Sequence, residues 1–234
     1  MITSGNTPTT TDDATTCIAP PQPPAKAVEP LRVRQFQAYR WRIPLTATCL
    51  ITGFGLALLS PPRILVDSQL DQWIDVSGYL LVAAGIALRL WAISSIDTRK
   101  SVVLVTSGPY GLCRNPLYVG TFLIAIGFLC LVQSLTMTLL TLPIILLYMW
   151  GVVPAEERVM RSRHGAAFDE YCAAVPRWIP HLHAISQLQV RPVWTSGLRR
   201  EVECGLWWIA IAIVVHVTCD MRMEPWWNHP FNCP

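Results

Sequence analysis

Long hydrophobic stretches alternate with short polar segments along this chain of 234 residues. Because a bilayer core about 30 Å thick needs roughly 20 apolar residues in a helix, such stretches predict membrane-spanning helices. Four of them approach this length once their flanks are included: 43–60, 79–96, 117–132 and 135–153. A shorter stretch, 205–219, predicts a fifth helix that crosses the membrane or lies at its surface. The predicted fold class is therefore all-α, a polytopic membrane protein with about five transmembrane helices.

The distribution of charge sets an expected orientation. Only 14% of the residues are charged and 52% are hydrophobic, a composition too apolar for a soluble domain of this size. With the N-terminus in the cytoplasm, most of the 18 Lys and Arg residues fall on the cytoplasmic side, as the positive-inside rule requires. We expect a cytoplasmic N-terminus and functional site and an external C-terminus. The same rule explains the net charge of +3 without a nucleic-acid partner.

The ends of the chain and its cysteines add further expectations. Residues 1–30 are rich in Thr and Pro, lack the apolar core of a signal peptide, and are predicted to form a disordered cytoplasmic tail. The eight cysteines include no C-x-x-C pair, and the spacing of His and Cys predicts neither a disulfide framework nor a metal site. We expect a transmembrane domain over 31–182 and a C-terminal extension over 183–234.

The third hydrophobic helix is predicted to start at Asn115. Pro116 suits the first turn of a helix, and an Asn before it is a favoured N-cap. The free N–H groups of a helix start, with Arg114 beside them, favour a bound carboxylate or phosphate. A simple cap with an arginine that anchors the membrane surface accounts for the same residues. Only Gln133 and Ser134 separate this helix from the next, so the two are predicted to form an antiparallel hairpin.

The hairpin returns the chain to the region of Asn115, where two adjacent carboxylates follow. Pro154 is predicted to restart a helix that has Glu156 and Glu157 in its first turn. Neighbouring positions on a helix point about 100° apart, so we expect one carboxylate to face a pocket and the other to pair with Arg161. A solvated, salt-bridged helix is the alternative.

Ordered motifs connect these features with a known family. They are Gly108-Pro109-Tyr110, Arg114-Asn115-Pro116-Leu117-Tyr118-Val119-Gly120, Glu156-Glu157, Gly165, Tyr171, Val175-Pro176-Arg177 and Ile179-Pro180. In this order they resemble the superfamily of integral membrane enzymes that contains the isoprenylcysteine carboxyl methyltransferases and the phospholipid methyltransferases, over about residues 85–181. The resemblance implies a methyltransferase that uses S-adenosylmethionine from the cytoplasm and a lipophilic or lipidated substrate from the bilayer.

The resemblance also assigns residues. It implies cofactor contacts at Val102, Val103, Leu104, Val105, Tyr110, Asn115, Pro116, Leu117, Tyr118, Glu156 and, from the phospholipid branch, Glu157. Arg114 and the helix start would hold the carboxylate of the cofactor, while acidic and aromatic side chains would attract its positive groups. We expect catalytic roles for Arg89, a cation within a membrane span that needs a partner or a cavity, and for Arg177, which would close over the cofactor or substrate.

Three departures from the family pattern leave the acceptor open. Asn115 stands where many relatives have His, which removes a titratable group but keeps a hydrogen-bonding cap. Val152 stands where the isoprenylcysteine enzymes have an Arg for the substrate carboxylate. Gly85-Ile86-Ala87 keeps one glycine of the Gly-x-Gly that phospholipid-type relatives carry.

Two other functions stay open. Membrane sterol and steroid reductases resemble the same C-terminal pattern, namely Gly165, Tyr171-Cys172, Val175-Pro176 and Ile179-Pro180. Against a reductase, Glu156 and Glu157 would repel the phosphates of NADPH. A noncatalytic membrane adaptor would keep these motifs only to stabilise the fold and would bind no nucleotide-like cofactor.

Overall fold

The computed structural model describes residues 36–60, 68–96, 104–180, 196–222, 224, 226 and 227. Within these ranges the regular structure is helical and there is no strand, which confirms the predicted all-α fold. The helices are α1 (Gln37–Leu59), α2 (Gln69–Ser94), α3 (Pro109–Leu112), α4 (Pro116–Val132), α5 (Leu135–Leu147), α6 (Val153–His164), α7 (Ala166–Ala174) and α8 (Ser196–Met221), with a π-helical turn (Tyr148–Val152) between α5 and α6. The predicted tail over 1–30 lies outside the described residues.

Within the described residues, four helices are long and apolar enough to cross a bilayer. They are α1, α2, the continuous helix Leu135–His164, and α8. α4 is also apolar but has only 17 residues. α8 begins at Ser196, well before the predicted stretch 205–219, and its 26 residues are enough to span a bilayer core. Large apolar side chains such as Trp207 remain exposed on α8, as expected of a helix that faces lipid. The chain is a multi-pass membrane protein.

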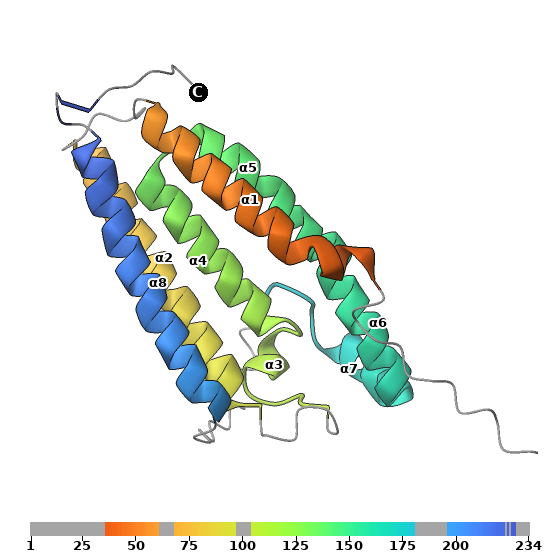
Figure 1. The fold of residues 1–234 in the computed structure, drawn as a ribbon. Helices are drawn as coiled ribbons and strands as arrows, with labels where there is room; N and C mark the ends of the chain where they lie inside the picture. The colour runs from red at the N-terminus through yellow and green to blue at the C-terminus, as the bar shows by residue number, and fades with distance from the viewer. Residues whose placement is uncertain are drawn as a thin grey trace, which may run out of the picture.

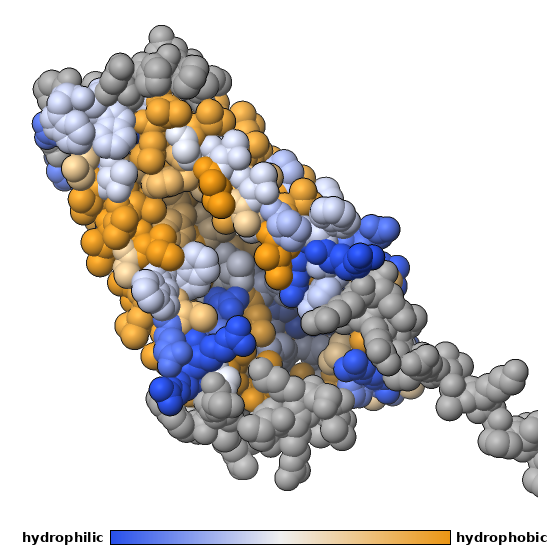
Figure 2. Space-filling model, in the orientation of Figure 1, coloured by the Kyte–Doolittle hydropathy of each residue, from blue (hydrophilic) through white to orange (hydrophobic). Residues whose placement is uncertain are grey.

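The long helices form two groups that meet at α4. Figure 1 shows α8 beside α2 on one side, α4 next to them, and α1 beside α5 on the other side. Helices α3, α6 and α7 gather toward one end of the bundle. In Figure 2 hydrophobic surface extends along the helices, while hydrophilic residues collect mainly toward the end that holds α6 and the start of α8. The predicted cofactor-binding residues that the structure describes lie toward this end.

Glycines let α2 and α4 approach closely. A Cβ atom added to Gly85 would lie 2.6 Å from the carbonyl oxygen of Gly120, and one added to Gly127 would lie 2.7 Å from that of Gly78. Small residues allow membrane helices to associate by direct van der Waals contact of their backbones. This contact fixes the start of α4 beside the last turns of α2.

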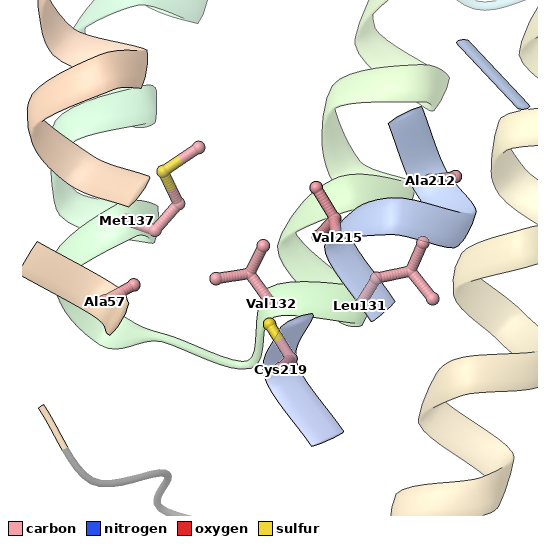
Figure 3. Packing of buried hydrophobic residues seen from close by; sticks show 7 residues of the cluster. All are labelled: Ala57, Leu131, Val132, Met137, Ala212, Val215 and Cys219. Atoms are coloured by element: carbon pink, nitrogen blue, oxygen red, sulfur yellow. The ribbon is translucent and has the colours of Figure 1, made fainter. Parts of the chain in front are cut away.

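A buried hydrophobic cluster joins the two groups at the opposite end of the bundle. Its members come from four helices: Ala57, Leu131, Val132, Met137, Ala212, Val215 and Cys219. Figure 3 shows Val132 of α4 between Met137 of α5 and Val215 of α8. Arg222 closes this end by donating to the carbonyl oxygens of Ala57 (2.7 Å) and Val132 (3.3 Å), the position in which a cation stabilises helix C-termini.

The hairpin and the helix that follows it place the two carboxylates. α4 ends at Gln133 in the left-handed conformation (φ 50°), and Ser134 caps α5, so the predicted hairpin is confirmed. Pro154 lies in the first turn of α6, as predicted, but there is no gap before it, because α5 continues through the π-helical turn. Proline has no N–H and its ring clashes with the preceding α-helical turn. The wider turn, in which the Val153 N–H bonds to the Tyr148 carbonyl, accommodates it.

Candidate active site

A cavity of about 300 Å³ lies where α4 begins and α6 passes it. Its walls are formed by Ile96, Leu104, Val105, Tyr110, Arg114, Asn115, Leu117, Tyr118, Glu156, Glu157, Val159, Met160, Arg163, Phe168 and Tyr171. The predicted contacts Leu104, Val105, Tyr110, Arg114, Asn115, Leu117, Tyr118, Glu156 and Glu157 all belong to this wall. Pro116 is buried in the first turn of α4 and is not part of the wall, and Val102 and Val103 lie outside the described residues.

Glu156 presents its carboxylate to the cavity. The hydroxyl of Tyr118 donates to its Oε1 at 2.8 Å, and Nη1 of Arg42, from α1, lies 3.8 Å from the same oxygen. The ring of Tyr118 also packs against that of Tyr148, with centroids 5.8 Å apart. About a third of the Glu156 side chain stays exposed, so the carboxylate is oriented by neighbours and still accessible. Arg42 had not been predicted as a site residue, because it is distant in sequence and shares its charge with many loop arginines.

Glu157 has a different environment. It is buried, and it accepts two hydrogen bonds from Arg177, at 3.1 Å and 2.5 Å, and one from the Asn115 amide at 3.3 Å. One glutamate was predicted to face a pocket and the other to pair with Arg161. The predicted pairing is wrong, because the partner of Glu157 is Arg177. Arg161 is exposed and pairs with Asp169 at 2.6 Å. The physical reason is that Arg177 reaches a buried carboxylate with two parallel N–H groups, a stronger arrangement than a solvated pair.

The start of α4 is held by the segment that follows α7. Asn115 occupies the N-cap position, but its side chain makes no capping hydrogen bond; its amide donates to Glu157 and to the carbonyl of Arg177. The N–H of Arg114 donates to the carbonyl of Pro176 at 2.8 Å, and its Nη1 donates to the Cys172 sulfur at 2.7 Å. Nη1 also lies 3.6 Å from the Glu157 carboxylate. The Arg114 guanidinium, predicted to hold a ligand carboxylate, is thus already engaged.

The two arginines predicted to be catalytic do not line the cavity. Arg177 forms the ion pair with Glu157. Arg89 donates from Nε to Glu201 of α8 at 2.6 Å and from Nη1 to Thr121 at 2.6 Å, while its aliphatic stem covers Gly120. These contacts satisfy a cation at membrane depth. Sequence reasoning missed Glu201 because it belongs to a helix far along the chain that is not part of the recognised motifs.

Several wall residues were not predicted: Ile96, Val159, Met160, Arg163, Phe168 and Tyr171. Three of them follow Glu156 on one face of α6, so helical periodicity could have found them. The Tyr171 hydroxyl donates to the carbonyl of Tyr110 at 2.7 Å, and burial raises the pKa of Tyr171, so this hydroxyl keeps its proton. The contact fixes α7 against α3.

The part of the chain that the structure describes contains no group of three or more His, Cys, Asp or Glu side chains arranged to hold a metal ion.

Comparison with known proteins supports the motif analysis. The family model described as phospholipid methyltransferase matches residues 73–167, which run from α2 to the start of α7. Over 81 residues the chain is 33% identical to a protein-S-isoprenylcysteine O-methyltransferase of Schizosaccharomyces pombe, covering 35% of this chain and 34% of that protein. No solved structure matches the chain.

Two longer matches carry different names. The chain is 32% identical over 161 residues to the nickel-cobalt-cadmium resistance protein NccN of Alcaligenes xylosoxydans xylosoxydans, covering 67% of this chain and 75% of that protein. It is 34% identical over 176 residues to the cobalt-zinc-cadmium resistance protein CzcN of Cupriavidus metallidurans, covering 75% of this chain and 78% of the relative.

Proposed function

The chain belongs to the phospholipid methyltransferase family, and from this premise we propose that it is an S-adenosylmethionine-dependent integral membrane methyltransferase with a lipophilic acceptor. The observation that carries the proposal is the cavity in which Glu156, oriented by Tyr118, stands among apolar walls at the start of α4. Its volume of about 300 Å³ lies at the lower end of the range for small-molecule sites.

The residues present fit this cofactor. S-adenosylmethionine combines a sulfonium and an ammonium group with a carboxylate and an adenosine. The Glu156 carboxylate and the Tyr118 ring suit the positive groups, and Leu104, Val105 and Phe168 offer apolar surface for the adenosine. When bound, the cofactor supplies an electrophilic methyl group.

The role of the chain's own residues is to bind and orient the reactants and to exclude water. The Tyr118 hydroxyl holds the Glu156 carboxylate in one orientation. The Glu157–Arg177 ion pair holds α6 against the segment after α7, and the Asn115 amide joins the start of α4 to both of these residues. A rigid wall of this kind matters because methyl transfer is a displacement whose rate depends on alignment of donor and acceptor. We propose that the acceptor reaches the cavity from the lipid-facing helices and that this end of the bundle is cytoplasmic.

Binding to the detergent-solubilised full chain tests the proposal. S-adenosylhomocysteine is expected to raise the melting temperature, because a ligand specific for the native state stabilises it by mass action. Glu156→Ala should remove most of this shift, whereas Arg161→Ala should leave it unchanged, since Arg161 is exposed and points to Asp169. Equal shifts in both variants would mean that the site is elsewhere.

A parallel titration separates the other functions. A reductase would be stabilised by NADPH and not by S-adenosylhomocysteine, and an adaptor would respond to neither. Either pattern would overturn the methyltransferase proposal.

The names of two relatives favour a physiological role in metal resistance. NccN and CzcN are named as resistance proteins for nickel, cobalt, zinc or cadmium, and we propose that methylation by this chain contributes to such resistance. In a host that lacks its own copy, the chain should improve growth in these metals, and Glu156→Ala should not. Full protection by the variant would separate resistance from the cavity.

A further inference from the structure

One charged side chain of the cavity wall has no partner within the described ranges. The wall contains four charged residues, of which Arg114, Glu156 and Glu157 all take part in ion pairs or hydrogen bonds. Arg163 is the fourth; it is exposed, and in the part of the chain that the structure describes no carboxylate lies within ion-pair distance of it. Its two neighbouring arginines on α6 are both engaged, Arg158 with the Pro154 carbonyl and Arg161 with Asp169.

Arg163 and Glu156 place opposite charges at two ends of the cavity wall along α6. Glu156, Met160 and Arg163 follow one another at intervals of four and three residues, so they share one face of the helix. Two helical turns, about 10.5 Å along the axis, separate the carboxylate from the guanidinium. The wall between them is apolar, with Val159 and Met160 on α6 and Phe168 on α7.

We propose that Arg163 binds the carboxylate at the methionine end of S-adenosylmethionine; this assignment rests on the proposed function. A guanidinium offers two parallel N–H groups to a carboxylate, and among the described residues Arg163 has no partner that the ligand would have to displace. Arg114, the residue expected to do this from the sequence, would first have to leave Cys172 and the Glu157 carboxylate. Its Nε is moreover enclosed in the protein and has no partner among the described residues.

This assignment orients the ligand along α6. With the carboxylate at Arg163, the sulfonium lies on the side of Glu156 and Tyr118, where α4 enters the membrane region. The methyl group then faces the side from which a lipophilic acceptor would arrive. Binding at Arg114 would instead turn the amino-acid end toward α7.

Two ligands that differ in the amino-acid group provide the test. S-adenosylhomocysteine carries the carboxylate, whereas 5′-methylthioadenosine keeps the adenosine and the sulfur but lacks the amino-acid group. Calorimetric titration of the detergent-solubilised full chain should show that Arg163→Gln weakens S-adenosylhomocysteine about 10-fold or more, the scale of a hydrogen bond to a charged group, and leaves 5′-methylthioadenosine unchanged. Arg163→Lys should lose less, because it keeps the charge without the paired donors.

Arg161→Gln is the matched control, because Arg161 is on the same helix and points to Asp169. It should change neither affinity. The assignment is overturned if Arg163→Gln binds S-adenosylhomocysteine as wild type does, or if it loses both ligands to the same extent. A wild-type chain that binds neither ligand would overturn the proposed function itself, and with it this assignment. Binding of S-adenosylhomocysteine that disappears in Glu156→Ala but persists in Arg163→Gln would overturn the assignment alone.

Discussion

Gly85→Ala should destabilise the bundle at the contact between α2 and α4. The added Cβ would lie 2.6 Å from the Gly120 carbonyl oxygen, 2.7 Å from the Ile124 Cγ1 atom and 3.0 Å from the Ile124 nitrogen. All three distances are shorter than ordinary van der Waals contacts, which are about 3.5–4.0 Å between carbon atoms, so the two helices must separate locally. Two of the three atoms belong to backbone and cannot rotate away, which makes helix displacement the only relief.

The size of the effect follows from two opposing terms. Overpacking of a tight contact costs about 1–3 kcal/mol. Replacement of a helical glycine by alanine returns roughly 0.5–1 kcal/mol, because the unfolded chain loses freedom. We therefore expect a net loss of about 1–2 kcal/mol for Gly85→Ala. Since 1.4 kcal/mol corresponds to a tenfold change in an equilibrium constant, the folded-to-unfolded ratio should fall roughly 10-fold.

Gly55→Ala is the control for this prediction. Gly55 lies in α1, and nothing comes within 4 Å of a Cβ placed there, so only the favourable term applies. Unfolding in detergent micelles by added sodium dodecyl sulfate, followed by tryptophan fluorescence, would measure both variants. Equal stability of the two variants would show that α2 and α4 are not in backbone contact, and the account of how α4 is positioned would fail.

Two further predictions use the same unfolding assay. Glu201→Gln should lower the free energy of unfolding by about 2–4 kcal/mol, because it leaves Arg89 without its carboxylate partner in a largely buried place. Combining it with Arg89→Leu should recover most of that loss, and strictly additive effects would contradict the pairing. Tyr171→Phe should cost about 1–2 kcal/mol by leaving the partly buried Tyr110 carbonyl without its donor. Tyr110→Phe keeps that carbonyl paired and should cost less; the reverse order would argue against this contact.

Local sequence signals were sufficient for the long helices, whereas most of the predicted cavity wall came from the resemblance to the methyltransferase family. Long apolar stretches have one stable solution in a bilayer, because every backbone N–H and carbonyl must be paired within the helix. The Asn115–Pro116 pair marked the start of α4, and Gln133 and Ser134 marked the hairpin. These signals act over a few residues, so they can be recognised without knowing the partners in space.

The partners of charged side chains required the tertiary structure. Nothing near Arg89 in the sequence points to Glu201, and nothing near Glu157 distinguishes Arg177 from Arg161 as its partner. The helical spacing allowed Glu157 and Arg161 to pair, but a long-range contact in a buried place offered stronger hydrogen bonds than an exposed one.

By itself the sequence determined that this chain crosses a membrane as helices and that a helix start and two carboxylates meet at one end of a hairpin. Only the tertiary structure decided that Glu156 faces the cavity while Glu157 holds the wall together. Only the tertiary structure decided, too, that among the described residues Arg114 has ion-pair and hydrogen-bond partners while Arg163 has none. The physical reason is the distance along the chain over which each interaction acts. Hydrophobicity and backbone geometry act on neighbours along the chain, whereas an ion pair depends on which helix packs beside which.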